Sequence, residues 1–147
     1  MIYIGADHGG YKLKEQLKKF LGKQGFEFKD LGALKFKDGD DYPDYATKVA
    51  REVSKNPLVN LGILICRSGQ GVCIVANKFK GVRAALVWNE QEYRMSRNDD
   101  MSNVLCLPSD YINTKLAEQI VKIWLNTSYS KESRHVRRVK KINNLEN

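Results

Sequence analysis

The segment that most constrains the fold is Leu61–Cys66, the uncharged run LGILIC. It lacks the alternation of polar and apolar residues found in a strand with one solvated face, and it is far too short to cross a membrane. Such a run is typical of a parallel strand that is covered on both faces. A chain built around it must supply helices for both sides of a sheet, which points to an α/β fold.

The rest of the chain supplies those helices, because strand-like and helix-like patterns alternate along it. Apolar strand-like segments occupy residues 1–5, 26–32, 61–66, 82–88 and 103–108. Helical patterns occupy residues 11–25, 44–56, 71–80, 89–100 and 114–126, and the tail from Lys131 predicts one more helix. This alternation predicts a three-layer α/β sandwich with a five-stranded, mostly parallel sheet. No repeat or linker interrupts it, so residues 1–147 are expected to form a single domain.

Composition excludes several classes of protein. Hydrophobic residues make up 42% and charged residues 29% of the sequence, which is the balance of a globular domain. We find no membrane-spanning run and no signal-peptide pattern, so no membrane partner is expected. Three cysteines without ligand spacing and only two histidines predict free thiols, no metal site and a cytoplasmic location.

Positive charge is concentrated toward the carboxyl end. The formal net charge is +8, and much of it comes from the segment KESRHVRRVKKI. Such a segment can attract nucleic acid or a phosphorylated ligand, or it can be the solvated face of a helix, and charge alone leaves these alternatives open. Arg134 and Arg138 are four residues apart, so on a helix they share a face and could clamp a phosphate group. His135 lies close to Arg138 on such a helix.

The turn after the buried run carries the strongest chemical signal. Cys66 ends the run and is followed by RSGQG before a helical pattern begins. Gly69 and Gly71 permit close approach of the backbone to a ligand, and a helix amino terminus favours negative charge. A thiol held there is favoured as a thiolate, and free N–H groups could stabilise an oxyanion. The alternative is an inert buried cysteine, which is the expectation for Cys73 and Cys106.

Polar and aromatic residues also occur where other elements meet. In GADHGG, Asp7 and His8 follow the first strand, and a carboxylate beside an imidazole can serve different atoms of one polar ligand. Asp7 could instead cap the next helix. Tyr42 precedes Pro43, which predicts an extended backbone there, and its ring could either cover a ligand or pack. Ligands of parallel sheets bind beyond the carboxyl ends of the strands, so the Cys66 turn and the Asp7 turn are expected at one edge.

Several segments taken together resemble a known family. GADHGGYKLKE, DYPDYA, GILICRSGQGVCIVANKFKGVRAAL, NVL and RHVRRV are similar to ribose-5-phosphate isomerase B and the galactose-6-phosphate isomerase subunits, in the same order over almost the whole chain. The resemblance implies a Rossmann-like fold and a homodimer or tetramer with active sites shared between subunits. It also implies the isomerisation of aldose and ketose phosphates, as in the pentose phosphate pathway, without a metal or an organic cofactor.

The resemblance further implies roles for individual residues of the turn. Cys66 corresponds to the base that moves a proton between C1 and C2 of the open-chain sugar. Ser68, Gly69 and Gly71 correspond to the loop that stabilises the enediolate through its N–H groups.

Other residues correspond to ligands of the two ends of the substrate. Asp7 and His8 match ligands of the sugar and the phosphate, and Tyr42 matches a tyrosine beside the sugar. Arg134 and Arg138 match arginines that hold the phosphate across the dimer interface.

The chain departs from the family pattern at several positions. Members usually carry His-Asn-Asp shortly before NVL, where this chain has Asp99 and Asp100 in place of the histidine and the asparagine. A phosphate-binding arginine commonly follows NVL, where this chain has Asp110. The glycine after the cysteine is replaced by Arg67, which could restore the lost positive charge. An aspartate is ordinarily ionised at neutral pH and needs burial to act as an acid, so His135 is an alternative to Asp99 for opening the sugar ring.

These observations lead to one main prediction and two alternatives. The main prediction is an isomerase that converts ribose 5-phosphate to ribulose 5-phosphate through a cis-enediolate, with Cys66 as the base. The alternatives are the same chemistry on a six-carbon sugar phosphate and a non-catalytic homologue that only binds a sugar phosphate. The Cys66 turn favours catalysis, because a mere binding protein needs no thiol there. Nucleic acid is not expected as a partner.

Overall fold

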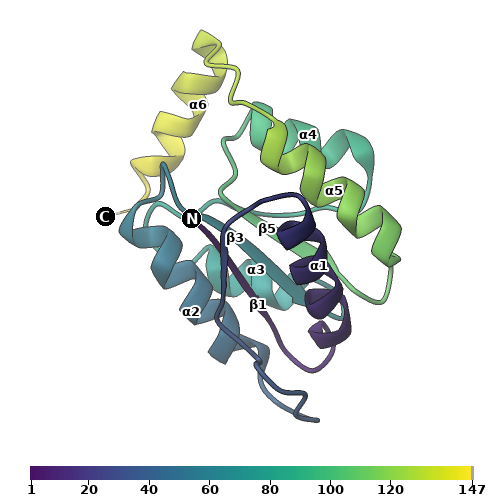
Figure 1. The fold of residues 1–147 in the computed structure, drawn as a ribbon. Helices are drawn as coiled ribbons and strands as arrows, with labels where there is room; N and C mark the ends of the chain where they lie inside the picture. Colours follow the sequence, from purple (N-terminus) through teal and green to yellow (C-terminus); the bar gives the residue numbers. More distant parts are fainter. Residues whose placement is uncertain (147) are drawn as a thin grey trace.

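The computed structural model describes residues 1–146, in which strands and helices alternate (Figure 1). The strands are β1 (Ile2–Ala6), β2 (Phe28–Asp30), β3 (Leu61–Cys66), β4 (Ala84–Leu86) and β5 (Val104–Pro108). The helices are α1 (Tyr11–Lys23), α2 (Tyr42–Lys55), α3 (Gln70–Ala76), α4 (Glu90–Asn98), α5 (Thr114–Asn126) and α6 (Ser133–Asn143). All strand pairs are parallel, in the order β2-β1-β3-β5-β4. The predicted α/β sandwich with a five-stranded parallel sheet is therefore confirmed.

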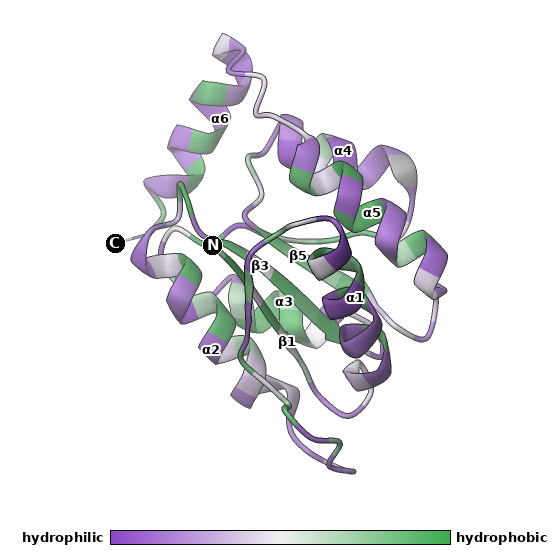
Figure 2. Ribbon diagram, in the orientation of Figure 1, coloured by the Kyte–Doolittle hydropathy of each residue, from purple (hydrophilic) through white to green (hydrophobic). Residues whose placement is uncertain are grey.

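One apolar layer lies on each face of the sheet, and β3 contributes side chains to both layers. Ile63 and Ile65 pack with α1 and α5, whereas Leu64 and Cys66 pack with α2 and α3. Figure 2 shows the apolar strands enclosed by helices with mixed faces. The continuous apolar run of β3 thus reflects burial on both sides. Four apolar residues of α2 that recur at helical spacing are fully buried: Ala46, Val49, Ala50 and Val53.

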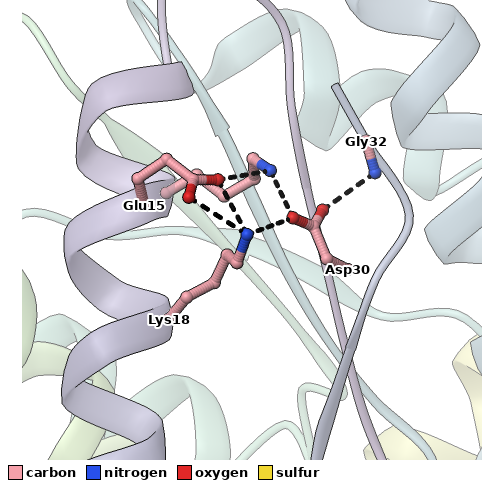
Figure 3. Close-up of polar contacts among 5 residues, drawn as sticks. Glu15, Lys18, Asp30 and Gly32 are labelled. Carbon is pink, nitrogen blue, oxygen red and sulfur yellow. Dashed lines mark hydrogen bonds and ion pairs between the residues drawn. The ribbon is translucent and has the colours of Figure 1, made fainter. Parts of the chain in front are cut away.

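Buried charges anchor helix α1 to the edge strand β2 (Figure 3). Lys14 is fully buried, and its Nζ lies 2.6 Å from Oδ2 of Asp30, which also pairs with Nζ of Lys18 at 2.7 Å. Glu15 pairs with both lysines. Burial opposes the ionisation of Asp30, but the hydrogen bonds from the lysines outweigh it and lower the pKa of this carboxyl. The apolar pattern of α1 did not predict the burial of Lys14.

Helix α2 begins at Tyr42, two residues before the predicted start at Asp44. The prediction of an extended backbone at Tyr42 is therefore wrong. Pro43 lies in the first turn, where a helix does not need the missing N–H and where the φ of proline is already helical. Asp7 does not occupy the N-cap position of α1, which is Gly10. Its Oδ1 instead accepts a hydrogen bond from the backbone N–H of Gly10 at 3.1 Å.

Helix α6 packs at the amino ends of β4 and β5. Arg83 directly precedes β4 and donates from Nη1 to Oδ1 of Asn143 at 3.3 Å. The backbone N–H of Gly81 donates to Oε2 of Glu146 at 2.8 Å. Figure 1 shows α6 in yellow at this end of the sheet, near the amino terminus of the chain. Because the sheet is parallel, α6 lies opposite the edge where the strands end.

None of the helices within residues 1–146 combines the length and the apolar character that a membrane-spanning helix requires.

Candidate active site

The order of the strands creates a switch point between β1 and β3. The chain leaves β1 toward β2 on one side, whereas β3 leads to β5 and β4 on the other. Loops that diverge in this way open a crevice at the carboxyl ends of the two strands. Ala6 pairs with Ile65, so Asp7 and Cys66 follow these partners at the same edge. The fold thus brings together two predicted groups that are far apart in the sequence.

The thiol of Cys66 is buried and hydrogen-bonded by the turn that follows it. Its Sγ accepts a hydrogen bond from the backbone N–H of Gly69 at 3.2 Å, and the residue is only 5% exposed. Gly69 has a φ of +70°, and a Cβ there would lie 2.5 Å from Cδ1 of Leu86 and 3.1 Å from the backbone N of Pro108. Glycine suits both this left-handed conformation and this space. The turn directs an N–H at the sulfur and thereby holds the thiol in place.

Tyr42 lies against the start of α3. A Cβ on Gly71 would lie 2.6 Å from Cζ of the Tyr42 ring, so the missing side chain makes room for the ring. Tyr42 remains 38% exposed and is accessible to a ligand. In the same turn, Oγ of Ser68 accepts a hydrogen bond from the backbone N–H of Gln70 at 3.3 Å. The structure therefore places Tyr42 beside the turn that the sequence analysis singled out.

Asp40 joins this edge, although the sequence analysis did not select it. Its Oδ1 accepts hydrogen bonds from the backbone N–H of His8 at 2.7 Å and from Nδ1 of the imidazole at 2.9 Å. The side-chain hydrogen bond with Asp40 raises the pKa of His8. Asp7 is buried beside it, and burial raises the pKa of its carboxyl. The one local signal for Asp40 is the acidic stretch DGDD, which does not reveal a partner 32 residues away.

Ser109 joins the ends of three strands, and the sequence analysis gave it no role. Its Oγ donates to the carbonyl of Gly9 at 2.9 Å and lies 3.2 Å from the carbonyl oxygen of Cys66. Its backbone N–H donates to the same Cys66 carbonyl at 3.0 Å. The residue fixes the peptide of Cys66 relative to the turn after β1. No local pattern predicts this role, because the contact with Gly9 spans 100 residues.

Arg67 is turned toward Asp110. A Cβ on Gly9 would lie 2.5 Å from Cγ of Arg67, so the side chain of Arg67 crosses Gly9. Its Nε lies 3.9 Å from Oδ2 of Asp110, and both side chains are more than half exposed. Two positions at which the chain departs from the resembled family therefore face each other with opposite charges.

A cavity of about 220 Å³ opens beside the Cys66 turn. It combines two aromatic rings at the carboxyl ends of β4 and β5 with polar groups of the turn. Its lining residues are Ser68, Gln70, Leu86, Trp88, Pro108 and Tyr111.

The other predicted proton-transfer residues lie at the opposite end of the sheet. Asp99 and Asp100 follow α4 and precede β5, at the amino ends of the strands. His135 is buried on α6, with Nδ1 2.6 Å from Oγ of Ser130 and 3.8 Å from Oδ1 of Asp99. Asp99 and His135 therefore form one group. Among the residues that the structure describes, no three His, Cys, Asp or Glu side chains gather as metal ligands would.

Arg134 and Arg138 are exposed at that same end. Nε of Arg134 lies 2.9 Å from Oε2 of Glu132. The five residues of β5 alone separate the two ends of the sheet by about 16 Å, at roughly 3.3 Å per residue. Within one chain, the predicted phosphate-binding arginines and Cys66 thus belong to opposite ends of the sheet.

The fold and the site together define an α/β protein that offers a small polar ligand a buried thiol and a glycine-rich turn at the switch point. The sequence comparison then identifies the family, because the model of the Ribose/Galactose Isomerase family matches residues 2–142. The chain belongs to this family, as the sequence resemblance predicts.

Individual relatives match along nearly their whole length. A protein of Mycoplasma genitalium named "Probable ribose-5-phosphate isomerase B" is 44% identical over 141 residues, which are 96% of this chain and 92% of the relative. The crystal structure of that organism's ribose-5-phosphate isomerase B with bound ribulose-5-phosphate has a TM-score of 0.95 at 43% identity, covering 99% of this chain and 95% of that chain. The enzyme of Clostridium thermocellum has a TM-score of 0.93 at 41% identity, covering 99% and 96%. The similarity therefore includes both ends of the sheet.

Proposed function

We infer that this chain is an aldose–ketose isomerase that interconverts ribose 5-phosphate and ribulose 5-phosphate. The observation that carries the inference is the hydrogen bond from the N–H of Gly69 to the thiol of Cys66 at the switch point. A protein that only bound a sugar phosphate would need no thiol held in this way there. The relative with bound ribulose-5-phosphate supports the choice of substrate.

The reaction moves one proton between two carbons, and Cys66 is the base that we assign to it. The thiolate removes the proton from C2 of the open-chain aldose, and the electron pair of the C–H bond forms the C1–C2 double bond of a cis-enediolate. The former carbonyl oxygen O1 takes the negative charge, which the N–H groups of Ser68 and Gly71 stabilise while the N–H of Gly69 faces the sulfur. The proton on O2 passes to O1, and the thiol returns a proton to C1. The product is the ketose, and the thiolate is regenerated.

The two ends of the sheet supply different parts of the proposed site. The carboxyl edge contributes the groups that bind the sugar: Asp7, His8, Tyr42, Arg67, Gly69 and Gly71. The amino edge contributes the groups that bind the phosphate and open the ring: Asp99, Asp100, Arg134, His135 and Arg138. Because one chain holds these sets at opposite ends, a complete site needs the amino edge of a second copy. This need supports a homodimer with two shared sites.

Ring opening requires a group that accepts the proton of the O1 hydroxyl and a group that protonates the ring oxygen. Asp99 and His135 lie 3.8 Å apart, and Ser130 orients the imidazole. A carboxylate beside an imidazole can supply both functions. We therefore assign ring opening to this pair.

A cytoplasmic location is part of the proposal. Three free cysteines favour a reducing compartment, and a phosphorylated sugar is an intracellular metabolite.

The function is tested by NMR with a panel of pentose and hexose phosphates in D₂O. We expect deuterium to enter C2 of ribose 5-phosphate and C1 of ribulose 5-phosphate, with much slower exchange in hexose phosphates. If deuterium entered only a hexose phosphate, that sugar phosphate would be the substrate instead of ribose 5-phosphate. Binding of sugar phosphates without any exchange would show a non-catalytic homologue.

The shared site is tested by mixing two defective subunits, Cys66→Ala and Arg138→Ala. A mixed dimer has one site with neither defect and one site with both. Random reassortment should therefore restore about one quarter of the wild-type rate at low substrate concentration, because half of the dimers are mixed and each regains one of two sites. If the mixture is no more active than its components, Cys66 and Arg138 of each active site come from the same subunit.

A further inference from the structure

The contacts of Asp40 single it out among the acidic residues before α2. Its side chain is only 4% exposed, although it lies in a surface loop. Its Oδ1 accepts two hydrogen bonds from one residue, from the backbone N–H and from Nδ1 of His8. The side chain of Tyr45, one turn into α2, interacts with the same carboxylate, which raises the pKa of Tyr45 to about 12. Asp40 thus links the end of β1 to the start of α2.

The Tyr45 ring is itself held in place. A Cβ on Gly32 would lie 2.7 Å from Cδ1 of this ring, so the ring rests on the backbone after β2. Nζ of Lys48 lies 5.4 Å from the centre of the ring. The carboxylate of Asp40 therefore interacts with a side chain that is packed in place.

This geometry fixes both the orientation and the proton of His8. A carboxylate can only accept, so Nδ1 must carry the hydrogen in the contact with Asp40. The imidazole then has Nε2 left for a ligand, and none of the side chains that the structure describes forms a hydrogen bond with it. The His8 side chain is 27% exposed, which leaves that nitrogen accessible.

We propose that Asp40 is a positioning residue for substrate binding: it holds His8 as an imidazolium whose Nε2–H binds an anionic or hydroxyl oxygen of the substrate. The proposal rests on the proposed function for the identity of the ligand. The charge on His8 matters at this edge, because Asp110 faces Arg67 at 3.9 Å and offsets part of its positive charge. His8 then adds positive charge to that of the neighbouring arginine.

The charged groups that face His8 act in one direction. Asp40 forms a hydrogen bond with the ring, and the negative charge of Asp7 adds to the effect. Partial desolvation opposes both, and the net result is a raised pKa for His8. Removing the charge of Asp40 should therefore make His8 lose its proton at a lower pH than in the wild type.

The test compares Asp40→Asn with Asp41→Asn, a neighbouring exposed carboxylate that serves as a matched control. The chain has only two histidines, so the ring signals of His8 can be followed by NMR in the ligand-free protein. We expect the titration of His8 to move to lower pH in Asp40→Asn and to stay unchanged in Asp41→Asn. The readout does not depend on catalysis, so it remains valid if the proposed function fails.

Steady-state kinetics give the second readout. KM for ribose 5-phosphate should be similar in wild type and Asp40→Asn at acidic pH, where His8 is protonated in both proteins. As the pH rises, KM should begin to increase at a lower pH in the variant, by about tenfold once the charged hydrogen bond is lost. The kcat should change by less than about threefold, because Asp40 does not touch the reacting carbons. Tyr45→Phe should produce a smaller shift in the same direction, which provides a second variant if Asp40→Asn folds poorly. An unchanged His8 titration, or a rise in KM that is independent of pH, would overturn the proposal.

Discussion

The backbone N–H of Gly69 donates a hydrogen bond to Sγ of Cys66 across 3.2 Å, so the shape of the turn and the chemistry of the thiol are linked. The link depends on a left-handed backbone at Gly69, with a φ of +70°. The same turn begins α3 and brings Gly71 beside the ring of Tyr42. A change in the turn should therefore alter catalysis before it alters the rest of the fold.

The first prediction concerns Gly69→Ala. The new methyl group meets Leu86 and the backbone of Pro108, and the left-handed conformation costs about 1–2 kcal/mol for a residue with a Cβ. We expect the turn to shift, the N–H to leave the sulfur, and kcat to fall by about 10²-fold, the usual loss for one such donor.

Gly25→Ala is the matched control for this change. Gly25 has a φ of +75°, and nothing lies within 4 Å of a Cβ added there. In chemical denaturation, Gly25→Ala should lose a similar free energy of unfolding to Gly69→Ala, while its kcat should stay at the wild-type value. Equal kcat values in the two variants would mean that the turn does not organise the thiol.

The second prediction concerns the thiol itself. Cys66→Ala should lower kcat by at least about 10³-fold, because a general base contributes roughly 10²–10⁴-fold. Binding of ribulose 5-phosphate, measured by calorimetry, should be retained. Cys73→Ala, at the half-buried cysteine of α3, is the control and should stay active. Full activity of Cys66→Ala would remove Cys66 from the role of base.

The sequence predicted the elements whose signals are local. The apolar run of β3 and the amphipathic pattern of α5 have in the structure the bounds that the sequence suggests. The inward face of α2 also follows from its spacing. Each of these signals arises from burial of neighbouring residues on one face, so a single segment contains all the information.

Long-range contacts explain what the sequence did not predict. Asp40 meets His8 across 32 residues, and Ser109 meets Gly9 across 100. The burial of Lys14 is not predicted by the pattern of α1, because only the position of β2 provides Asp30 as its partner. The family resemblance supplied Arg134 and His135 as site residues, but their place at the opposite end of the sheet required the strand order.

The third prediction addresses the arginines of α6. Arg138→Ala should raise KM for ribose 5-phosphate by about tenfold or more, since a hydrogen bond to a charged group is worth roughly 1.5–3 kcal/mol. The kcat should fall much less, because the phosphate is remote from the reacting carbons. Arg137→Ala removes the same charge from another face of the helix and serves as the control. An unchanged KM in Arg138→Ala would exclude this residue from the phosphate site.

The fourth prediction concerns the charges that hold α1 to β2. Asp30→Ala leaves the buried Lys14 with only Glu15 as a partner and should cost up to about 3–5 kcal/mol in urea denaturation. Replacing both residues by apolar ones, as in Lys14→Met with Asp30→Leu, should recover much of this loss. Glu52→Ala, which breaks an exposed pair with Lys55, should cost less than about 1 kcal/mol. Equal losses in Asp30→Ala and Glu52→Ala would contradict the importance of burial.

The pH dependence of stability follows from the same carboxylate. The pKa of folded Asp30 lies below its ordinary value of 3.8, so its contribution is complete above that value and is lost as the pH falls through the folded-state pKa. The free energy of unfolding of the wild type should therefore decline below about pH 4. Asp30→Asn should show a weaker decline in this range. A parallel decline in the two proteins would show that other carboxyls account for it.

The last prediction separates ring opening from proton transfer at carbon. Ribose 5-phosphate closes to a ring, whereas ribulose 5-phosphate cannot form a five-membered ring because its O5 carries the phosphate. His135→Ala should therefore slow the conversion of ribose 5-phosphate by about 10²-fold, while solvent deuterium still enters C1 of ribulose 5-phosphate at nearly the wild-type rate. His135 is buried against Ser130, so the variant should also lose about 1–3 kcal/mol of stability, and rates should be measured well below its Tm. Ser130→Ala serves as a partial control that loosens the imidazole without removing it. If His135→Ala converts ribose 5-phosphate normally, the step belongs to Asp99 or to water. If instead both reactions slow equally, His135 acts on the enediolate and not on the ring.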